Sequence, residues 1–149
     1  MPAIQTSYPL GIAKAFEGMI ANSEPGVVVS RIVESAAGIG FGKVAARGAD
    51  DDGIIVSAAV VKPLGITVAD STQVAAVADV YPQYSIVGVM TKGVIWVIAS
   101  VAVADGDPVY FVPATGVFTN VSSGNIAIPN AVFDSTTTTT NQLAKVRLA

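Results

Sequence analysis

β-branched side chains dominate the apolar part of this chain. The 149 residues include 24 Val and 13 Ile but only 4 Leu. Val and Ile are stiff about χ1 and fit the pleated surface of a sheet better than a helix. The apolar runs have the length of strands and end at Gly, Pro, Asp or Asn, and they cover residues 27–33, 54–61, 86–90, 94–103 and 108–112. The sequence therefore predicts an all-β fold.

Short turns join several of these runs. Residues 90–94 and 112–117 each predict a hairpin, because Gly93 and Gly116 can supply the positive φ that tight turns need. An acidic turn at 50–53 separates an expected strand at 43–46 from the next run. A last strand is expected from Leu143 to Leu148. Turns at this spacing favour a sandwich or a compact barrel.

The expected organisation is a single domain over residues 1–149. Residues 8–22 contain Pro and two Gly and follow neither the helix nor the strand period, so residues 1–24 are interpreted as an extended arm with room for one short helical turn. Residues 25–149 form the expected β domain. Within it, the Thr-rich stretch 135–142 is a polar loop of low complexity.

Composition restricts the possible functions. Charged residues make up 13% of the chain, about half the usual share, so either something other than charge keeps the surface soluble or part of the surface is covered. The chain has no His and no Cys, which removes imidazole bases, thiol nucleophiles, disulfides and Cys or His zinc sites. A net charge of −3 and a pI near 4.6 argue against nucleic acid as a partner. The longest apolar stretch, 94–104, is too short to cross a membrane, and the first residues do not resemble a signal peptide.

The candidate motifs fail in detail. A phosphate loop at 38–43 would need Gly where Ala37 stands and Ser or Thr where Val44 stands. An EF-hand that uses Gly53 would place Ala59 where the bidentate Glu belongs. We therefore expect no catalytic residue, no cofactor, no metal and no enzyme activity. Tyr81 and Tyr84 form either a contact patch or a pair with one buried and one exposed ring.

Several stretches, taken in order, resemble the cement, or head-decoration, proteins of tailed bacteriophages. They comprise residues 4–8, Phe16-Glu17-Gly18-Met19-Ile20-Ala21-Asn22, residues 39–44 and 64–68, Val89-Met90-Thr91-Lys92-Gly93-Val94-Ile95-Trp96-Val97, and residues 103–119 with Ala114-Thr115-Gly116-Val117-Phe118-Thr119. The resemblance covers roughly positions 4 to 119, and the Thr-rich loop has no counterpart in it.

This resemblance implies a small all-β protein with a jelly-roll-like sandwich fold. It also implies a structural virion protein without catalysis. Such a protein would associate with itself as a homodimer or homotrimer on the outer surface of the phage head. It would bridge subunits of the major capsid protein, after assembly in the cytoplasm of the host bacterium. The hypothesis places the arm across a neighbouring subunit and the two hairpin tips outward or on the capsid, and it predicts that deletion of residues 1–20 abolishes head binding. The candidate contacts are Tyr8, Phe16, Met19, Ile20, Lys92 and Thr115.

Two alternatives remain at this point. The first is another phage virion module, such as a tail-tube, baseplate or fibre component. The second is a carbohydrate-binding β-sandwich, which would present aromatic rings from loops. Tyr81 and Tyr84 are the evident platform for a sugar, because Trp96 lies inside an expected strand.

Overall fold

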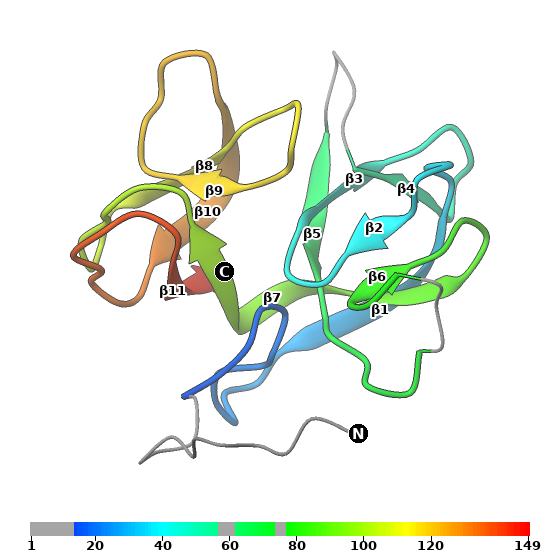
Figure 1. Cartoon of the computed structure of the whole chain (residues 1–149), viewed down its shortest axis with the longest axis horizontal. Coiled ribbons are helices and arrows are strands. Elements are labelled where there is room, and N and C mark those ends of the chain that lie inside the picture. Colours follow the sequence, from blue (N-terminus) through cyan, green and yellow to red (C-terminus); the bar gives the residue numbers. More distant parts are fainter. Residues whose placement is uncertain (1–13, 57–61, 74–76) are drawn as a thin grey trace, which may run out of the picture.

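A computed structural model of the chain describes residues 14–56, 62–73 and 77–149 (Figure 1). No helix forms within these ranges, which confirms the all-β fold class. The strands are β1 (Val27–Val33), β2 (Ile39–Gly40), β3 (Val44–Arg47), β4 (Gly53–Ile55), β5 (Pro63–Thr67), β6 (Val80–Tyr81), β7 (Ile86–Ala99), β8 (Pro108–Phe111), β9 (Phe118–Thr119), β10 (Ile126–Phe133) and β11 (Gln142–Leu148).

Strand β7 organises the fold, because it belongs to two closed rings. The nine-stranded sheet runs β1-β4-β3-β5-β7-β11-β10-β8-β9, and extra pairings of β7 with β1 and with β9 close it twice. The first ring contains β1, β4, β3, β5 and the first half of β7. The second ring contains the second half of β7 with β11, β10, β8 and β9. Figure 1 shows the rings as two lobes with β7 passing between them at the bottom. Of the expected architectures, these pairings describe a compact barrel type.

The expected hairpin at residues 90–94 is wrong. Gly93 has φ +124°, and it bends the chain without reversing it. Residues on its two sides pair with different neighbours: Met90 faces Ile66 of β5, whereas Val94 faces Arg147 of β11. The two apolar runs therefore form one strand of 14 residues. A side chain at position 93 would lie 3.2 Å from Met90 Sδ and 3.3 Å from Gly26 Cα, so the crowding there also favours glycine.

Other local predictions are confirmed. Strand β1 has the expected bounds, and β8 and β9 form the expected hairpin, in which the N–H of Val112 donates to the carbonyl of Val117 over 2.9 Å. The acidic turn joins β3 to β4, and the C-terminal strand is β11. The run expected at 54–61 is shorter in the structure, since β4 ends at Ile55 and residues 57–61 lie outside the described ranges.

Two apolar clusters fill the rings. The larger contains the buried residues of the second ring, including Phe111, Phe118 and Phe133, and it extends to Val44 and Ile66 of the first ring. The smaller lies under β2 and β6 and contains Val33, Ile39, Phe41, Ile54, Tyr81 and Val87. Because the larger cluster includes residues of both rings, the rings share core as well as strand β7.

The Thr-rich loop is tied to the second ring. Thr137 is buried, its N–H donates to the carbonyl of Val103 over 2.9 Å, and its hydroxyl accepts from the N–H of Val103 over 3.0 Å. The hydroxyl of Ser135 accepts from the N–H of Lys145 over 2.8 Å. These bonds hold the loop against its neighbours, so it is an ordered connection between β10 and β11.

Candidate functional site

The N-terminal segment lies along β7 of its own chain. The N–H of Gly18 donates to the carbonyl of Trp96 over 2.8 Å, the N–H of Trp96 donates to Met19 over 2.9 Å, and Ile20 pairs with Ile95. After a loop at residues 22–26, β1 continues antiparallel along the first half of β7, from Val27 opposite Lys92 to Ile32 opposite Ile86. Residues 18–33 thus line one edge of β7. The boundary at residue 24 between arm and β domain stays a prediction.

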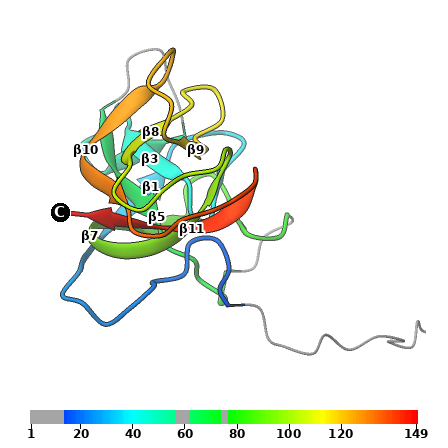
Figure 2. The same cartoon turned by 90° about the vertical axis from the view of Figure 1, so that its left-hand side faces the viewer.

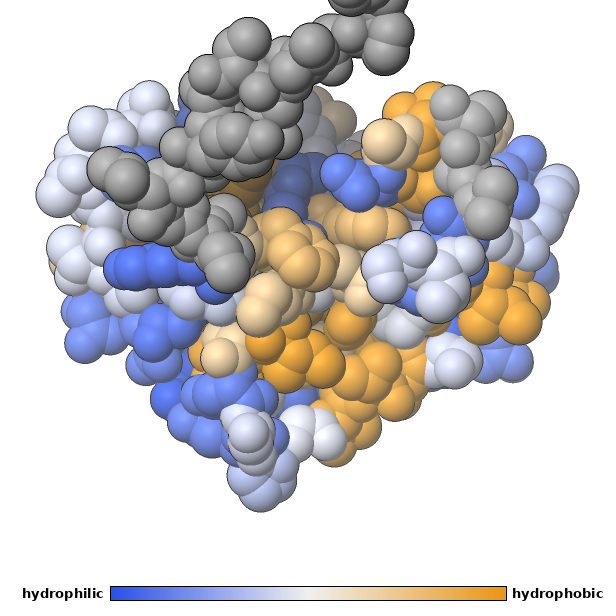
Figure 3. Space-filling view, turned by 60° about the horizontal axis from the view of Figure 1, so that its bottom comes forward, coloured by the Kyte–Doolittle hydropathy of each residue, from blue (hydrophilic) through white to orange (hydrophobic). Residues whose placement is uncertain are grey.

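Exposed apolar side chains gather on this part of the molecule. Six of the ten exposed large hydrophobic residues of the described chain lie on β7 or on the stretch beside it, and Phe16 and Ile86 reach 57% and 67% exposure. We call these six residues the seam surface: Phe16, Ile20, Val27, Val28, Ile32 and Ile86. Figure 3 views the molecule from the side of β1, β7 and the N-terminal segment, and it shows apolar residues gathered across the middle of this face. Apolar patches of this kind mark sites of interaction in proteins.

Two ion-pair groups fasten the segment beside β7. The ammonium of Lys43, the residue before β3, pairs with the carboxylate of Glu17. The Arg147 guanidinium of β11 pairs with Glu24 and also donates to Asp134 Oδ2 over 3.2 Å. This guanidinium holds the pKa of Glu24 below its ordinary value, and the two carboxylates raise the pKa of Arg147. The segment from 14 to 26 is therefore placed by charge as well as by backbone hydrogen bonds.

The structure brings together only some of the sequence-predicted contacts. Phe16, Met19 and Ile20 lie on the segment beside the second half of β7, and Phe16 and Ile20 are exposed while Met19 is half-buried. Lys92 is exposed, but it lies within β7 opposite Val27 and not at a hairpin tip. Thr115 is exposed at the tip of the β8–β9 hairpin. Tyr8 lies outside the described residues.

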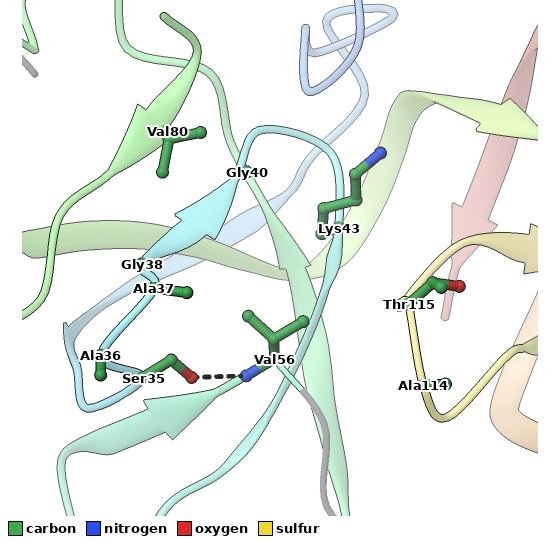
Figure 4. A pocket seen from close by; sticks show the side chains of 10 residues that line it. All are labelled: Ser35, Ala36, Ala37, Gly38, Gly40, Lys43, Val56, Val80, Ala114 and Thr115. Carbon is green, nitrogen blue, oxygen red and sulfur yellow. Dashed lines mark hydrogen bonds between the residues drawn. The ribbon is translucent and has the colours of Figure 1, made fainter. Parts of the chain in front are cut away.

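Thr115 lies apart from the residues beside β7 and borders an open groove of about 530 Å³. Figure 4 shows Ala114 and Thr115 on the hairpin, across the groove from residues 35–40. The lining is mostly small and apolar, and the Lys43 ammonium at its side is already paired with Glu17. The groove thus presents no group that is arranged for acid–base or nucleophilic chemistry.

The acidic turn at 50–53 has a structural role. The carboxylate of Glu34 accepts the N–H of Ala49 over 2.8 Å and that of Asp50 over 2.9 Å. These two bonds lower the pKa of Glu34 from its ordinary value, with the bond from Asp50 the larger cause. Among residues 14–56, 62–73 and 77–149, no group of three or more acidic residues is placed to hold a metal ion. The part of the chain that the structure describes contains no helix of the length and apolar character that crossing a bilayer requires.

The tyrosine pair consists of one buried and one exposed ring. Tyr81 is buried with its ring 5.0 Å from that of Phe41, and burial raises its pKa to about 12. Tyr84 is 76% exposed and has φ +65°, a conformation that costs a non-glycine residue energy.

The sequence did not predict that Val27, Val28, Ile32 and Ile86 would be exposed together on one surface. The available sign of this surface in the sequence was that the strands carrying these residues are apolar on both faces.

Comparisons with known proteins agree with this architecture. A chain in the solved structure of the capsid of Myoviridae phage XM1 is similar over 98% of this chain and 97% of its own length, with a TM-score of 0.79 and 20% identity. At that identity the likeness speaks for the fold alone. No curated protein matches the sequence. A family model described as structural cement protein (E217 gp24/Pam3 gp6) matches residues 4–149. Since this match spans nearly the whole sequence, the chain belongs to the family of phage structural cement proteins.

Proposed function

We propose that this protein is a capsid cement protein that binds the outer surface of a phage head and bridges neighbouring subunits of the major capsid protein. Membership in the cement family and the likeness to a chain of the XM1 capsid structure support a role on the head. The observation that carries the bridging role is the seam surface. It is an exposed apolar face on a chain with only 13% charged residues, and its segment is fastened at both ends by ion pairs.

The mechanism is repeated weak contact. Each copy covers apolar surface on two neighbouring capsid subunits, and burial of one large aliphatic or aromatic side chain contributes about 1.5–3 kcal/mol. A homodimer or homotrimer repeats that contact on a symmetric shell, so the assembly gains avidity without one very tight interface. The head then resists internal pressure because subunits are connected across their boundaries. The protein is made in the bacterial cytoplasm and then binds the head. Its role is binding and involves no chemical reaction.

Binding to heads tests this proposal. Purified protein is added to heads that lack it, and bound protein is measured by co-sedimentation in a density gradient. Phe16→Asp and Ile20→Asp, which put charge on the seam surface, are expected to weaken binding at least tenfold each, because about 1.4 kcal/mol corresponds to a factor of ten. Val121→Asp, at a residue that is 46% exposed and lies in the loop before β10, is the matched control and should bind normally.

The role of the N-terminal arm is tested separately. Deletion of residues 1–20 would also remove the bond of Gly18 to Trp96 and the ion pair of Glu17 with Lys43, so a loss of binding could reflect a damaged fold. Deletion of residues 1–13 keeps both, and it is expected to weaken head binding while thermal stability stays unchanged. Migration of the wild-type protein with tails, or normal binding by the Phe16 and Ile20 variants, would refute the proposed function.

A further inference from the structure

The salt bridges of the molecule leave half of its basic side chains without a counter-ion. All 8 Lys and Arg and all 11 Asp and Glu lie in the ranges that the structure describes. Four basic residues form salt bridges: Arg31, Lys43, Lys145 and Arg147. Within the described chain the other four form none: Lys14, Arg47, Lys62 and Lys92. A basic group without a carboxylate on its own molecule is available to a carboxylate of a partner.

Two of these four groups border the seam surface. Lys92 is exposed and lies opposite Val27 on the neighbouring strand, so their side chains are adjacent on one face. Lys14 is exposed two residues before Phe16, at the start of the segment beside β7. Figure 3 shows hydrophilic residues around the apolar middle of this face. The seam surface therefore has ammonium groups at its border.

The other two groups lie on a different part of the first ring. The N–H of Arg47 donates to the carbonyl of Lys62 over 3.0 Å, so both residues lie where the end of β3 meets the start of β5. In Figure 1 the start of β5 is at the top, whereas the N-terminal segment and β7 are at the bottom. Lys62 is exposed like Lys92, so it offers a control for charge away from the seam surface.

Salt bridges neutralise the carboxylates on the part of the chain that carries the seam surface. Residues 14–33 and strand β7 contain two acidic residues, Glu17 and Glu24. Lys43 pairs with the first and Arg147 with the second. Neither carboxylate is left to compensate the ammonium groups at the border.

One further carboxylate lies close to this segment. Asp70 follows Ala69, whose N–H donates to the carbonyl of Gly18 over 2.8 Å. Oδ1 of Asp70 accepts the N–H and the hydroxyl of Thr72, over 2.8 and 2.6 Å. Even with this carboxylate counted, the two unpaired ammonium groups exceed the unpaired negative charge. The face is therefore positive on a chain whose net charge is −3.

We propose that the seam surface docks on a patch of the major capsid protein in which carboxylates flank exposed apolar side chains. Phe16 and Ile20 pack against the apolar part, and the ammonium groups of Lys14 and Lys92 pair with the carboxylates around it. An apolar centre with a polar rim is the usual arrangement of a protein interface. This inference rests on the proposed function and names the chemistry of the partner in it.

Charge elsewhere on the molecule supports one orientation of approach. Asp50 and Asp51 in the turn between β3 and β4, and Asp105 after β7, are exposed and form no salt bridge in the described chain. An acidic capsid patch attracts the seam surface and repels these loops. Complementary charge of this kind speeds association and selects the face that binds.

Head binding at two salt concentrations tests the pairing. Co-sedimentation with heads that lack the protein gives the apparent Kd, and thermal melts show that each variant is folded. Lys92→Glu and Lys14→Glu should each weaken binding at least threefold, and the double variant at least tenfold, at about 0.1 M NaCl, because each reversal replaces attraction with repulsion. Lys92→Arg keeps the charge and should bind normally. Lys62→Glu makes the same charge change away from the seam surface and should alter the Kd less than twofold.

Salt should reduce these differences. The screening length falls from about 10 Å at 0.1 M to about 3 Å at 1 M, so the double variant should approach wild-type affinity at the higher concentration. A loss of binding that is equally large at both concentrations would overturn the inference. An equal loss in Lys62→Glu, or tighter binding by Lys92→Glu, would overturn it as well.

The outcomes separate this inference from the proposed function. If Phe16→Asp and Ile20→Asp lose binding while the folded double variant of Lys14 and Lys92 binds like the wild-type protein, the proposed function stands and the acidic partner is wrong. Wild-type protein that binds no heads at either salt concentration refutes the proposed function, and the inference with it.

Discussion

Because both rings share strand β7, we predict that they unfold together. A destabilising substitution in the second ring should therefore lower the free energy of unfolding of the first ring by the same amount. Phe133 on β10 is fully buried in the larger cluster, far along the sheet from β1 and β3. Phe133→Ala removes a large buried side chain, which costs about 3–5 kcal/mol. Domains of this size have a stability of about 5–15 kcal/mol, so the variant should still fold.

Two measurements give the magnitude and its distribution. Urea unfolding is followed by the fluorescence of Trp96, the single Trp of the chain. With a slope of about 2 kcal/mol per molar urea, the midpoint should fall by roughly 1.5–2.5 M with the slope unchanged. Hydrogen exchange then reports on both rings. Amides that exchange only through global unfolding should exchange roughly 10²- to 4 × 10³-fold faster in β3 and β5 as well as in β10 and β11.

The shared strand and the shared core are the reasons for this expectation. If exchange accelerates in β8, β10 and β11 while β3 and β5 keep their protection, the rings unfold independently and the reasoning is refuted. Phe16→Ala is the control, because Phe16 is 57% exposed and its truncation should change the free energy of unfolding by less than about 0.5 kcal/mol.

Three further perturbations test local features. Gly65→Ala places a Cβ 2.1 Å from the carbonyl oxygen of Met90, so β5 and β7 must separate. The melting temperature should fall by several degrees, and an unchanged melting temperature would contradict the close approach of the two strands. Arg147 lowers the pKa of Glu24, so this ion pair stabilises the 22–26 loop above pH 4.5, and the stabilisation is lost as the pH falls through the lowered pKa. NMR chemical shifts of the loop should follow this loss, and Glu24→Gln should abolish the pH dependence. Tyr84→Gly relieves a positive φ of 65° and should raise the free energy of unfolding by up to about 1 kcal/mol in a thermal melt, whereas a decrease would show that the exposed ring contributes to stability.

Local pattern was enough to predict those elements whose signals lie within a few residues. Strand β1, the β8–β9 hairpin and the turn before β4 follow from apolar runs and turn residues alone. The bend at Gly93 could not be predicted in this way. A glycine after two polar residues looks the same whether the chain reverses or continues, and the outcome depends on β5 and β11, which are distant in sequence.

The candidate surface shows the same division. The sequence indicated that some two-faced apolar strands would be covered by a partner, and Phe16 and Ile20 were chosen from the resemblance of their segment to a family. That Val28, Ile32 and Ile86 are exposed depends on which strands close the first ring, since β4 accompanies β1 over only two residues. The lengths and the register of the paired strands decide which residues are exposed at an edge. Neither can be predicted from the apolar periodicity of a single strand.

The single strand that both rings share also has a mechanical meaning. With 14 residues, β7 measures about 46 Å along the chain, through the bend at Gly93, and its ladder bonds to β1 on one half and to β11 on the other run across the strand. A force that pulls the two lobes apart along β7 therefore loads these hydrogen bonds in shear, all together, and does not peel them one after another. Shear is the geometry in which a small sheet resists tension best, so a molecule built around this strand can transmit a load from one lobe to the other without unfolding either.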